Sequence, residues 1–160
     1  MNIFVLNDNP KLAAQDLCDK HCVKMILEST QILSTVAQLR GHKGCYKITH
    51  SSHPCVKWTA NNSANWNWLI EHSLAMCLEY TLRYNKIHSC EKHIKNFKDR
   101  TFEIWNDNKH YKEHTPFEKC MPEQYKRDNV VDAYRAYYVG HKAKFAKWKM
   151  KKPEWFQLLK

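Results

Sequence analysis

The segment from Lys20 to Leu39 restricts the fold more than any other part of the sequence. At about 100° per residue, its polar side chains fall within a sector of roughly 80° of a helix, and nearly every other position is apolar or small. An ordinary surface helix has one apolar stripe and a wide polar face. This pattern is the reverse and predicts a largely buried helix whose polar stripe faces a cleft, an internal network or a narrow strip of solvent. The stripe consists of His21, Lys24, Glu28, Gln31 and Thr35.

A second long helix, predicted over residues 56–86, repeats this pattern. Its polar sector of about 60° holds Asn61, Asn65, Trp68, His72, Glu79, Arg83 and Lys86. If the two helices pack together, the two stripes would converge into one polar cavity. Helical phase leaves a second arrangement open, in which both stripes face solvent and pairs such as Lys24–Glu28 are incidental neighbours at i,i+4.

The types of residue on the two stripes favour the cavity. Buried charges are costly unless they are paired or functional, and histidines titrate near neutral pH. A carboxylate beside lysine and histidine is typical of a general base or an electrostatic stabiliser. We therefore expect Glu28 to act as general base or to stabilise a cation, with Lys24 beside it to hold an anionic group. We expect His21 and His72 to carry protons.

The charge of the chain points to an anionic partner. Lys and Arg number 26 against 16 Asp and Glu, which gives a formal net charge of +10 over 160 residues. A small domain this basic repels itself unless an anion is nearby, although the lysines could also serve only to keep a Trp-rich protein soluble. The densest basic cluster, which would contact phosphates, contains Lys142, Lys144, Lys147, Lys149, Lys151 and Lys152. The neighbouring aromatic residues Trp148, Trp155 and Phe156 would either stack on unpaired bases or pack in the core.

The seven cysteines and the absence of long apolar runs indicate a cytoplasmic protein with free thiols. The start of the chain lacks the pattern of a signal peptide. Cys18, His21 and Cys22 lie close together, but no second cysteine pair has zinc-ligand spacing, so we expect no metal. The chain has no Walker-type loop, GxGxxG or HExxH motif, and we expect no cofactor.

Turn and capping signals divide the chain without any repeat or linker. Residues 2–6 form a short apolar extended segment, and Asn9 with Pro10 can begin a helix. Residues 91–105 are predicted to be helical, residues 106–122 irregular, and residues 129–150 a final helix, followed by a tail that packs back on the body. We expect one all-α domain over residues 1–160. It would be a bundle of three to five helices with a short extended N-terminal segment and a long irregular loop region.

Several short motifs resemble the phage pyrimidine-dimer DNA glycosylases of the endonuclease V type. They are Asp19-Lys20-His21 followed by Glu28, Tyr46-Lys47-Ile48-Thr49, Cys77-Leu78-Glu79 followed by Arg83-Tyr84, and Pro153-x-Trp155. The chain also resembles small uncharacterised phage proteins that share the DKH…KMILE and HPC…W stretches. The resemblance implies an all-helical protein that binds duplex DNA, needs no cofactor and flips a nucleotide out of the stack. It places Glu28 at the family's catalytic glutamate.

The resemblance also implies a nucleophile, which in that family is the α-amine at the start of the chain. That amine forms a Schiff base with the sugar. This chain departs from the family in two ways: it is longer before Asp19, and it has Lys24 and His21 where the family has arginines near the glutamate.

These observations predict a glycosylase-like, DNA-acting enzyme that processes a flipped base or nucleotide between the two long helices. Alternatives are a phage DNA base-hypermodification transferase, which would need a co-substrate, and a non-catalytic module that binds a nucleotide or a protein. DNA is the expected partner, with no membrane, and the oligomeric state is left open. The residues expected to bind the ligand or nucleic acid are Asp19, Lys20, Gln31, Asn65, Trp68, Glu79, Arg83, Lys147, Lys149, Lys151 and Lys152.

Overall fold

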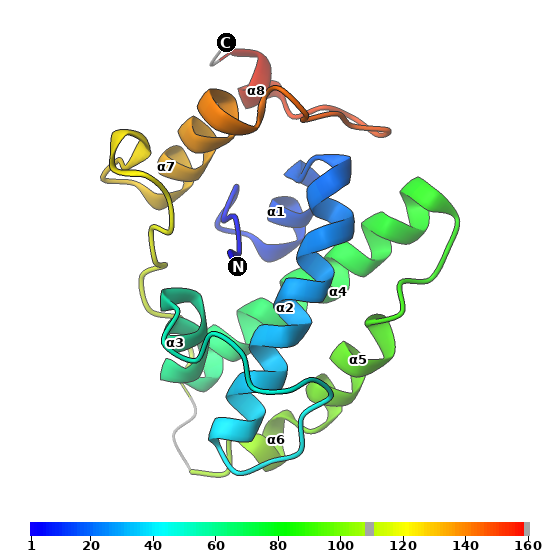
Figure 1. The fold of residues 1–160 in the computed structure, drawn as a ribbon, viewed down its shortest axis with the longest axis vertical. Coiled ribbons are helices and arrows are strands. Elements are labelled where there is room, and N and C mark those ends of the chain that lie inside the picture. Colours follow the sequence, from blue (N-terminus) through cyan, green and yellow to red (C-terminus); the bar gives the residue numbers. More distant parts are fainter. Residues whose placement is uncertain (108–110, 159–160) are drawn as a thin grey trace.

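The computed structural model describes residues 1–107 and 111–158, and this part of the chain is all-α without a strand (Figure 1). It contains eight α-helices, so the predicted three to five were too few. The elements are α1 (Pro10–Asp16), α2 (Asp19–Leu39), α3 (Pro54–Asn61), α4 (Ser63–Tyr84), α5 (Glu91–Asp99), α6 (Thr101–Ile104), the 3₁₀ turn η1 (Glu123–Tyr125), α7 (Val130–Tyr137), the π-helical turn η2 (Tyr138–Lys142) and α8 (Glu154–Leu158).

Helices α2 and α4 form the centre of the molecule. They pack against each other, and α4 also contacts α1, α3 and α5. Ile26, Ile32 and Leu33 of α2 are fully buried, as are Trp66 and Leu69 of α4. Each such side chain contributes roughly 1.5–3 kcal/mol by leaving water. The predicted burial of α2 is therefore confirmed, and its start and end differ from the prediction by at most one residue.

The long helix predicted over residues 56–86 is wrong, because Asn62 divides it into α3 and α4. The Asn62 backbone is extended, with φ −157° and ψ 169°. Its side chain accepts a hydrogen bond from the Asn65 amide at 2.8 Å and so caps the start of α4. Asparagine is among the preferred residues at this position because its oxygen satisfies a free helix amide. The break lets α3 turn and contact α2 and α4 separately.

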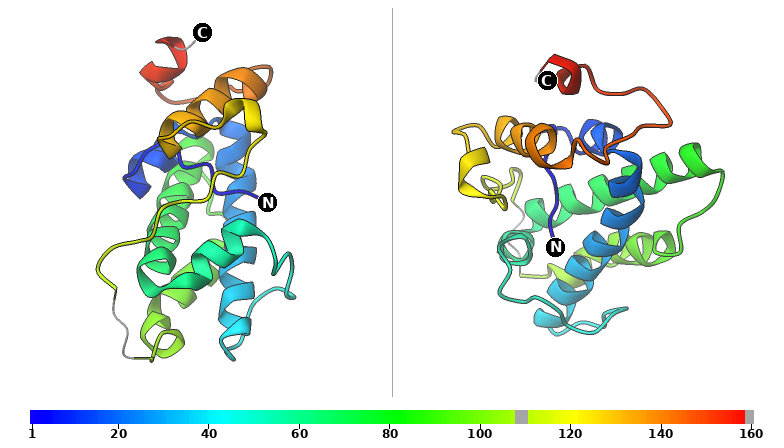
Figure 2. Two further views of the ribbon diagram at one scale, coloured as in Figure 1. Left: turned by 90° about the vertical axis from the view of Figure 1, so that its left-hand side faces the viewer. Right: turned by 45° about the horizontal axis from the view of Figure 1, so that its top comes forward.

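The N-terminal segment, residues 2–6, is buried as predicted and lies between the α2–α4 pair and α7 (Figures 1 and 2). It is not extended throughout as predicted, because the chain turns at Phe4, whose φ is +55°. The Leu6 carbonyl accepts a hydrogen bond from Arg135 Nε at 3.0 Å. The Phe4 ring makes edge contacts with Tyr134 and Tyr138, at 6.0 and 5.7 Å between centroids. The C-terminal part of the chain therefore packs over the first residues.

The final helix predicted over residues 129–150 was too long. The regular helix α7 ends at Tyr137 and passes into the η2 turn, where a Cβ on Gly140 would clash with the Tyr125 ring. The C-terminal lysines are thus outside a regular helix. The tail does pack back on the body, since the indoles of Trp148 and Trp155 donate to the Asp16 carbonyl and carboxylate at 3.1 and 2.8 Å.

The polar stripe of α4 is used for internal structure. Asn65 Nδ2 donates to the Trp58 carbonyl at 2.6 Å and to Thr115 Oγ1 at 2.8 Å. Trp68 donates to the Asp8 carbonyl at 2.9 Å, and His72 Nδ1 lies 2.9 Å from the Pro10 carbonyl. These side chains join α4 to the loops around α1 and to residue 115. They were predicted to face a ligand, and their partners are instead groups of the same chain.

Arg83 and Glu79 at the end of α4 also have internal partners. All three guanidinium nitrogens of Arg83 donate hydrogen bonds. The acceptors are the carboxylates of Glu79 and Asp19 and the carbonyls of Gln15 and Leu17. This network joins α4 to the junction between α1 and α2. The five N–H donors of Arg83 are therefore occupied within the chain, so these contacts do not support its predicted role in binding the ligand or nucleic acid.

The two polar stripes consequently have different neighbours. The α4 stripe faces α1 and residue 115, whereas Glu28 on the α2 stripe contacts the N-terminal residues. These contacts do not support one cavity shared by both stripes, because helical phase fixes the face of a helix but not what packs on it.

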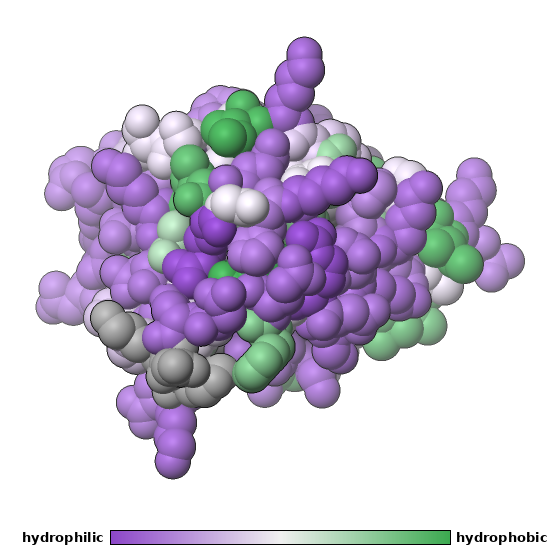
Figure 3. Space-filling view, turned by 90° about the horizontal axis from the view of Figure 1, so that it is seen from below, coloured by the Kyte–Doolittle hydropathy of each residue, from purple (hydrophilic) through white to green (hydrophobic). Residues whose placement is uncertain are grey.

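The surface seen from below is largely hydrophilic, with separate apolar patches (Figure 3). Exposed apolar side chains include Leu78, Leu82 and Ile87 near the end of α4. Among the helices within residues 1–107 and 111–158, none has the length and apolar character needed to cross a bilayer.

The burial of His72 predicts a pH-dependent stability. Burial lowers the pKa of His72 from 6.5 to about 4. Protonation therefore favours the unfolded chain, so stability is full above pH 6.5 and falls as the pH drops towards 4. At pH 5 the loss from this group is about 2 kcal/mol. Urea unfolding at pH 7 and pH 5 should show that His72→Gln, which keeps a hydrogen-bond donor, loses about 2 kcal/mol less than the unmodified protein. An equal loss in both proteins would contradict this assignment.

Candidate active site

Glu28 lies on the side of α2 that faces the start of the chain. Its Oε2 accepts a hydrogen bond from the Asn2 amide at 3.1 Å and lies 3.7 Å from the α-ammonium nitrogen of Met1. Its Oε1 lies 3.4 Å from Lys24 Nζ, one helical turn earlier. The Glu28 side chain is 13 % exposed and that of Lys24 is 64 % exposed. The carboxylate is therefore largely enclosed by the N-terminal residues, while its lysine neighbour reaches solvent.

Asn2 fixes the position of the first residues. Its Nδ2 donates to the Cys120 carbonyl at 2.7 Å, and its Oδ1 accepts from the Ile3 amide at 2.8 Å and from the Tyr134 hydroxyl at 3.0 Å. Tyr134 belongs to α7, so residues far away in sequence hold the start of the chain beside Glu28. These contacts keep the Met1 α-amine and the Asn2 amide next to the Glu28 carboxylate.

Phe4 adopts a backbone conformation that residues other than glycine seldom adopt. Its φ is +55°, in the left-handed region, which costs roughly 1–3 kcal/mol. The Phe4 ring stacks on His21 at 4.4 Å between centroids and lies 6.2 Å from the ring of Tyr137. Such strain persists only where the surrounding packing imposes it. Here the ring contacts hold the turn that directs residues 1–3 toward Glu28.

His21 is held neutral by its surroundings. It is 5 % exposed, and its Nδ1 lies 2.6 Å from the Tyr138 hydroxyl. Burial, together with Lys142, Lys24 and Lys20, lowers the pKa of His21 to about 3. Burial keeps both imidazoles uncharged near neutral pH, which disfavours the predicted role of His21 and His72 as proton carriers.

A set of lysines surrounds the buried Phe4–His21 pair. Lys142 Nζ lies 4.6 Å from the Tyr137 ring and 5.8 Å from the Phe4 ring, and Lys20 Nζ lies 4.9 Å from the Phe145 ring. Together with exposed Lys24, these residues give the side of the molecule next to Glu28 a positive charge. We call Lys20, Lys24 and Lys142 the basic rim.

The C-terminal lysine segment adjoins this rim. The Asp19 amide donates to the Lys147 carbonyl at 2.8 Å, and the Lys149 amide donates to Asp19 Oδ1 at 3.1 Å. These bonds fix residues 147–149 on the first turn of α2, which also carries Lys20. The side chains of Lys147, Lys149 and Lys151 are exposed and that of Lys152 is half-buried. Gln31, also predicted to bind ligand, is half-buried one turn after Glu28.

Four residues that were not predicted as site residues complete this region: Asn2, His53, Cys55 and Cys120. His53 lies close enough to be affected electrostatically by both charges: burial and the Met1 ammonium lower the pKa of His53, while Glu28 raises it. Cys55, Cys120 and Asn2 lie beside it. The HPC stretch contains His53 and Cys55, and the α-amine was suggested only by the family resemblance. No sequence pattern indicated Asn2 or Cys120, because their contacts join distant parts of the chain.

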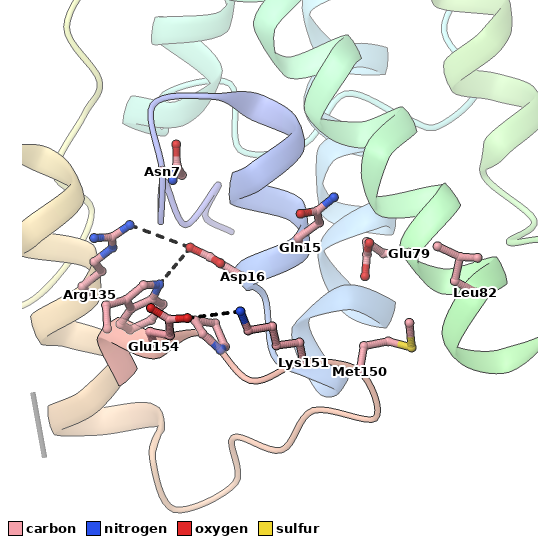
Figure 4. A pocket seen from close by; sticks show the side chains of 11 residues that line it. Asn7, Gln15, Asp16, Glu79, Leu82, Arg135, Met150, Lys151 and Glu154 are labelled. Atoms are coloured by element: carbon pink, nitrogen blue, oxygen red, sulfur yellow. Dashed lines mark hydrogen bonds and ion pairs between the residues drawn. The ribbon is translucent and has the colours of Figure 1, made fainter. Parts of the chain in front are cut away.

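A separate hollow of about 570 Å³ lies between α1, α4, α7 and the C-terminal segment (Figure 4). Its walls include the carboxylates of Asp16, Glu79 and Glu154. Burial raises the pKa of Asp16, which accepts a hydrogen bond from Trp155 and lies 3.8 Å from Arg135 Nη2. Neither Glu28 nor the first residues line this hollow. Several carboxylates disfavour a phosphate ligand, so Glu28 is the stronger candidate for DNA chemistry.

Comparison with known proteins identifies the family. The family model described as pyrimidine dimer DNA glycosylase matches residues 1–92, which is more than half of the chain and includes Glu28 and His53. The searches of curated proteins and of solved structures gave no match. Proteins of the matching family are enzymes that act on DNA. The chain belongs to the pyrimidine dimer DNA glycosylase family.

Proposed function

We propose that this protein excises a damaged pyrimidine from duplex DNA, with the α-amine at the start of the chain as nucleophile and Glu28 as its acid–base partner. One observation carries the proposal: Glu28 Oε2 lies 3.7 Å from the Met1 α-ammonium group and 3.1 Å from the Asn2 amide nitrogen. An α-amine at either residue, Asn2 being first if Met1 is removed, would lie beside the carboxylate. The resemblance to the family implies an α-amine nucleophile of this kind.

In the proposed reaction the amine attacks C1′ of the deoxyribose. A bond forms between the amine nitrogen and C1′, and the glycosidic bond breaks with its electron pair on the base nitrogen, which takes up a proton from water. Glu28 accepts the proton released from the nitrogen, and its charge stabilises the positive character that develops at C1′. The bond between C1′ and the ring oxygen O4′ then breaks with its electron pair on O4′, which takes up the proton held by Glu28. The nitrogen lone pair forms the C=N bond of the protonated Schiff base. Lys24, 3.4 Å from Glu28 Oε1, would hold a neighbouring phosphate.

The basic rim and the lysine segment at residues 147–152 are proposed to bind the DNA backbone. They adjoin each other through the bonds between Asp19 and residues 147 and 149. Exposed lysines beside the reacting groups would neutralise phosphates and position the flipped nucleotide.

Replacing Glu28 should abolish the chemistry without unfolding the protein. Glu28→Gln keeps the size of the side chain and an oxygen that can accept the hydrogen bond from the Asn2 amide. It removes the carboxylate that would accept the proton. We expect the rate of glycosidic-bond cleavage in a duplex with one pyrimidine dimer, read as conversion of that site to an abasic sugar, to fall by at least about 100-fold. Glu71→Gln, an equal charge change at an exposed position of α4, should retain activity. If both variants stay folded by circular dichroism and Glu28→Gln stays active, Glu28 is not the acid–base group.

Blocking the α-amine should remove the covalent intermediate. We expect borohydride to trap the protein on damaged duplex, and expect a version with two extra residues before Met1 to give no adduct while still binding the duplex. If the protein with the two added residues is also trapped, the nucleophile is a group other than an α-amine beside Glu28. If the unmodified protein binds DNA but traps none, the transferase alternative is favoured. If it binds no DNA at moderate salt, the non-catalytic module is favoured.

The lysine segment should determine part of the salt dependence of binding. Each phosphate contact contributes about 0.9 to the slope of log affinity against log salt. The double variant Lys147→Gln/Lys149→Gln should lower the slope by about 1–2, measured by fluorescence anisotropy. Lys92→Gln/Lys98→Gln, the same charge change at exposed positions of α5, should leave it unchanged. Equal slopes in all three proteins would place the DNA on another surface.

A further inference from the structure

Three side chains with metal-binding atoms meet next to the candidate active site. One ligand atom from each of His53, Cys55 and Cys120 lies within 4.8 Å of the other two. The Sγ atoms of Cys55 and Cys120 are 3.6 Å apart. His53 precedes the first residue of α3, and Cys55 lies in its first turn. Cys120 comes from the irregular segment before α7, so the fold alone brings the third ligand to the other two.

The spacing of these atoms matches that of ligands around a tetrahedral ion. With Zn–S bonds of about 2.3 Å, two thiolates on a tetrahedral zinc lie about 3.8 Å apart, and a sulfur and an imidazole nitrogen lie about 3.6 Å apart. The observed sulfur separation is 3.6 Å. A small rotation of the half-buried His53 ring would complete the three-ligand set.

We propose that His53, Cys55 and Cys120 form a binding site for a thiophilic divalent cation of the zinc class. Two thiolates and one imidazole are a known set of zinc ligands, and they leave the fourth position to water or to a substrate group. The site goes beyond the proposed base excision, whose steps use only the α-amine and Glu28. Cys55 is 2 % exposed and the other two ligands are half-buried, so the ion would be sheltered but reachable from solvent.

A disulfide explains the same residues less well. Bonded sulfurs are about 2.05 Å apart, so the observed pair would have to approach each other and lose two electrons to an oxidant. A disulfide also gives no role to His53, whereas a metal uses all three side chains. The lone pair of His53 Nδ1 accepts a hydrogen bond from the Cys55 amide at 3.1 Å. A bound ion would compete with that helix cap, because neutral imidazole has one lone pair.

The ion would connect parts of the chain that hold the active site. Asn2 Nδ2 donates to the Cys120 carbonyl at 2.7 Å, and the Cys120 amide lies 3.2 Å from the Tyr134 hydroxyl. A cation bridging α3 to Cys120 would therefore restrain the residue whose carbonyl accepts the hydrogen bond from Asn2. Because a ligand that binds only the folded state raises stability, the melting temperature should increase with metal concentration.

Metal content and cobalt spectroscopy test the site without reference to activity. The reduced full-length protein, purified without chelator, should contain about one zinc per chain by elemental analysis. After chelation and titration with Co²⁺ in the absence of oxygen, it should show the visible bands of tetrahedral cobalt and a near-ultraviolet thiolate charge-transfer band. Cys55→Ser and Cys120→Ser should each lose most of that charge-transfer intensity. His53→Asn, which retains a helix-capping side chain, should bind Co²⁺ at least roughly tenfold more weakly.

Cys45→Ser is the matched control, since Cys45 is a half-buried free cysteine outside the cluster. It should leave both the stoichiometry and the cobalt spectrum unchanged. The proposal is overturned if the folded, reduced protein binds no stoichiometric cobalt, or if Cys45→Ser weakens binding as much as Cys55→Ser. It is also overturned if thiol counting on freshly purified protein shows Cys55 and Cys120 joined as a disulfide that, once reduced, gives no metal binding.

Discussion

The contact between Glu28 and the first two residues is the interaction on which the active-site proposal depends. A carboxylate that is 13 % exposed needs compensating partners. The Met1 ammonium and the Asn2 amide supply them on one side, and Lys24 does so on the other. The same contact fixes the α-amine. A single carboxylate on α2 therefore anchors the start of the chain, and in the proposed reaction the same carboxylate accepts a proton from the α-amine.

The remainder of the fold keeps this contact in place. The partners of Asn2 and Phe4 include Cys120, Tyr134 and Tyr137. These residues lie beyond residues 1–92, which match the family model. The part of the chain that resembles the family thus supplies Glu28 and the first residues, and the C-terminal part holds them in position. Helix α4 contributes indirectly, because its polar groups join α1 to the helical core.

Sequence patterns predicted local features well. The bounds and burial of α2 followed from helical periodicity, and the burial of residues 2–6 followed from their apolar run. The role of Glu28 stays a prediction. The break at Asn62 escaped prediction because a capping asparagine can also occupy a helix interior. The internal contacts of the α4 stripe were not predicted, because periodicity shows which residues share a face of a helix but not which element covers that face. The roles of Asn2 and Cys120 depend on contacts across more than a hundred residues, which a single sequence does not reveal.

The most direct measurement is to locate the covalent bond to DNA. The protein would be trapped on a damaged duplex with borohydride, digested, and the modified peptide identified by mass spectrometry. The proposed mechanism predicts a sugar adduct on the α-amine of the first residue, whether Met1 or Asn2. An adduct on an internal lysine, Lys24 above all, would contradict it.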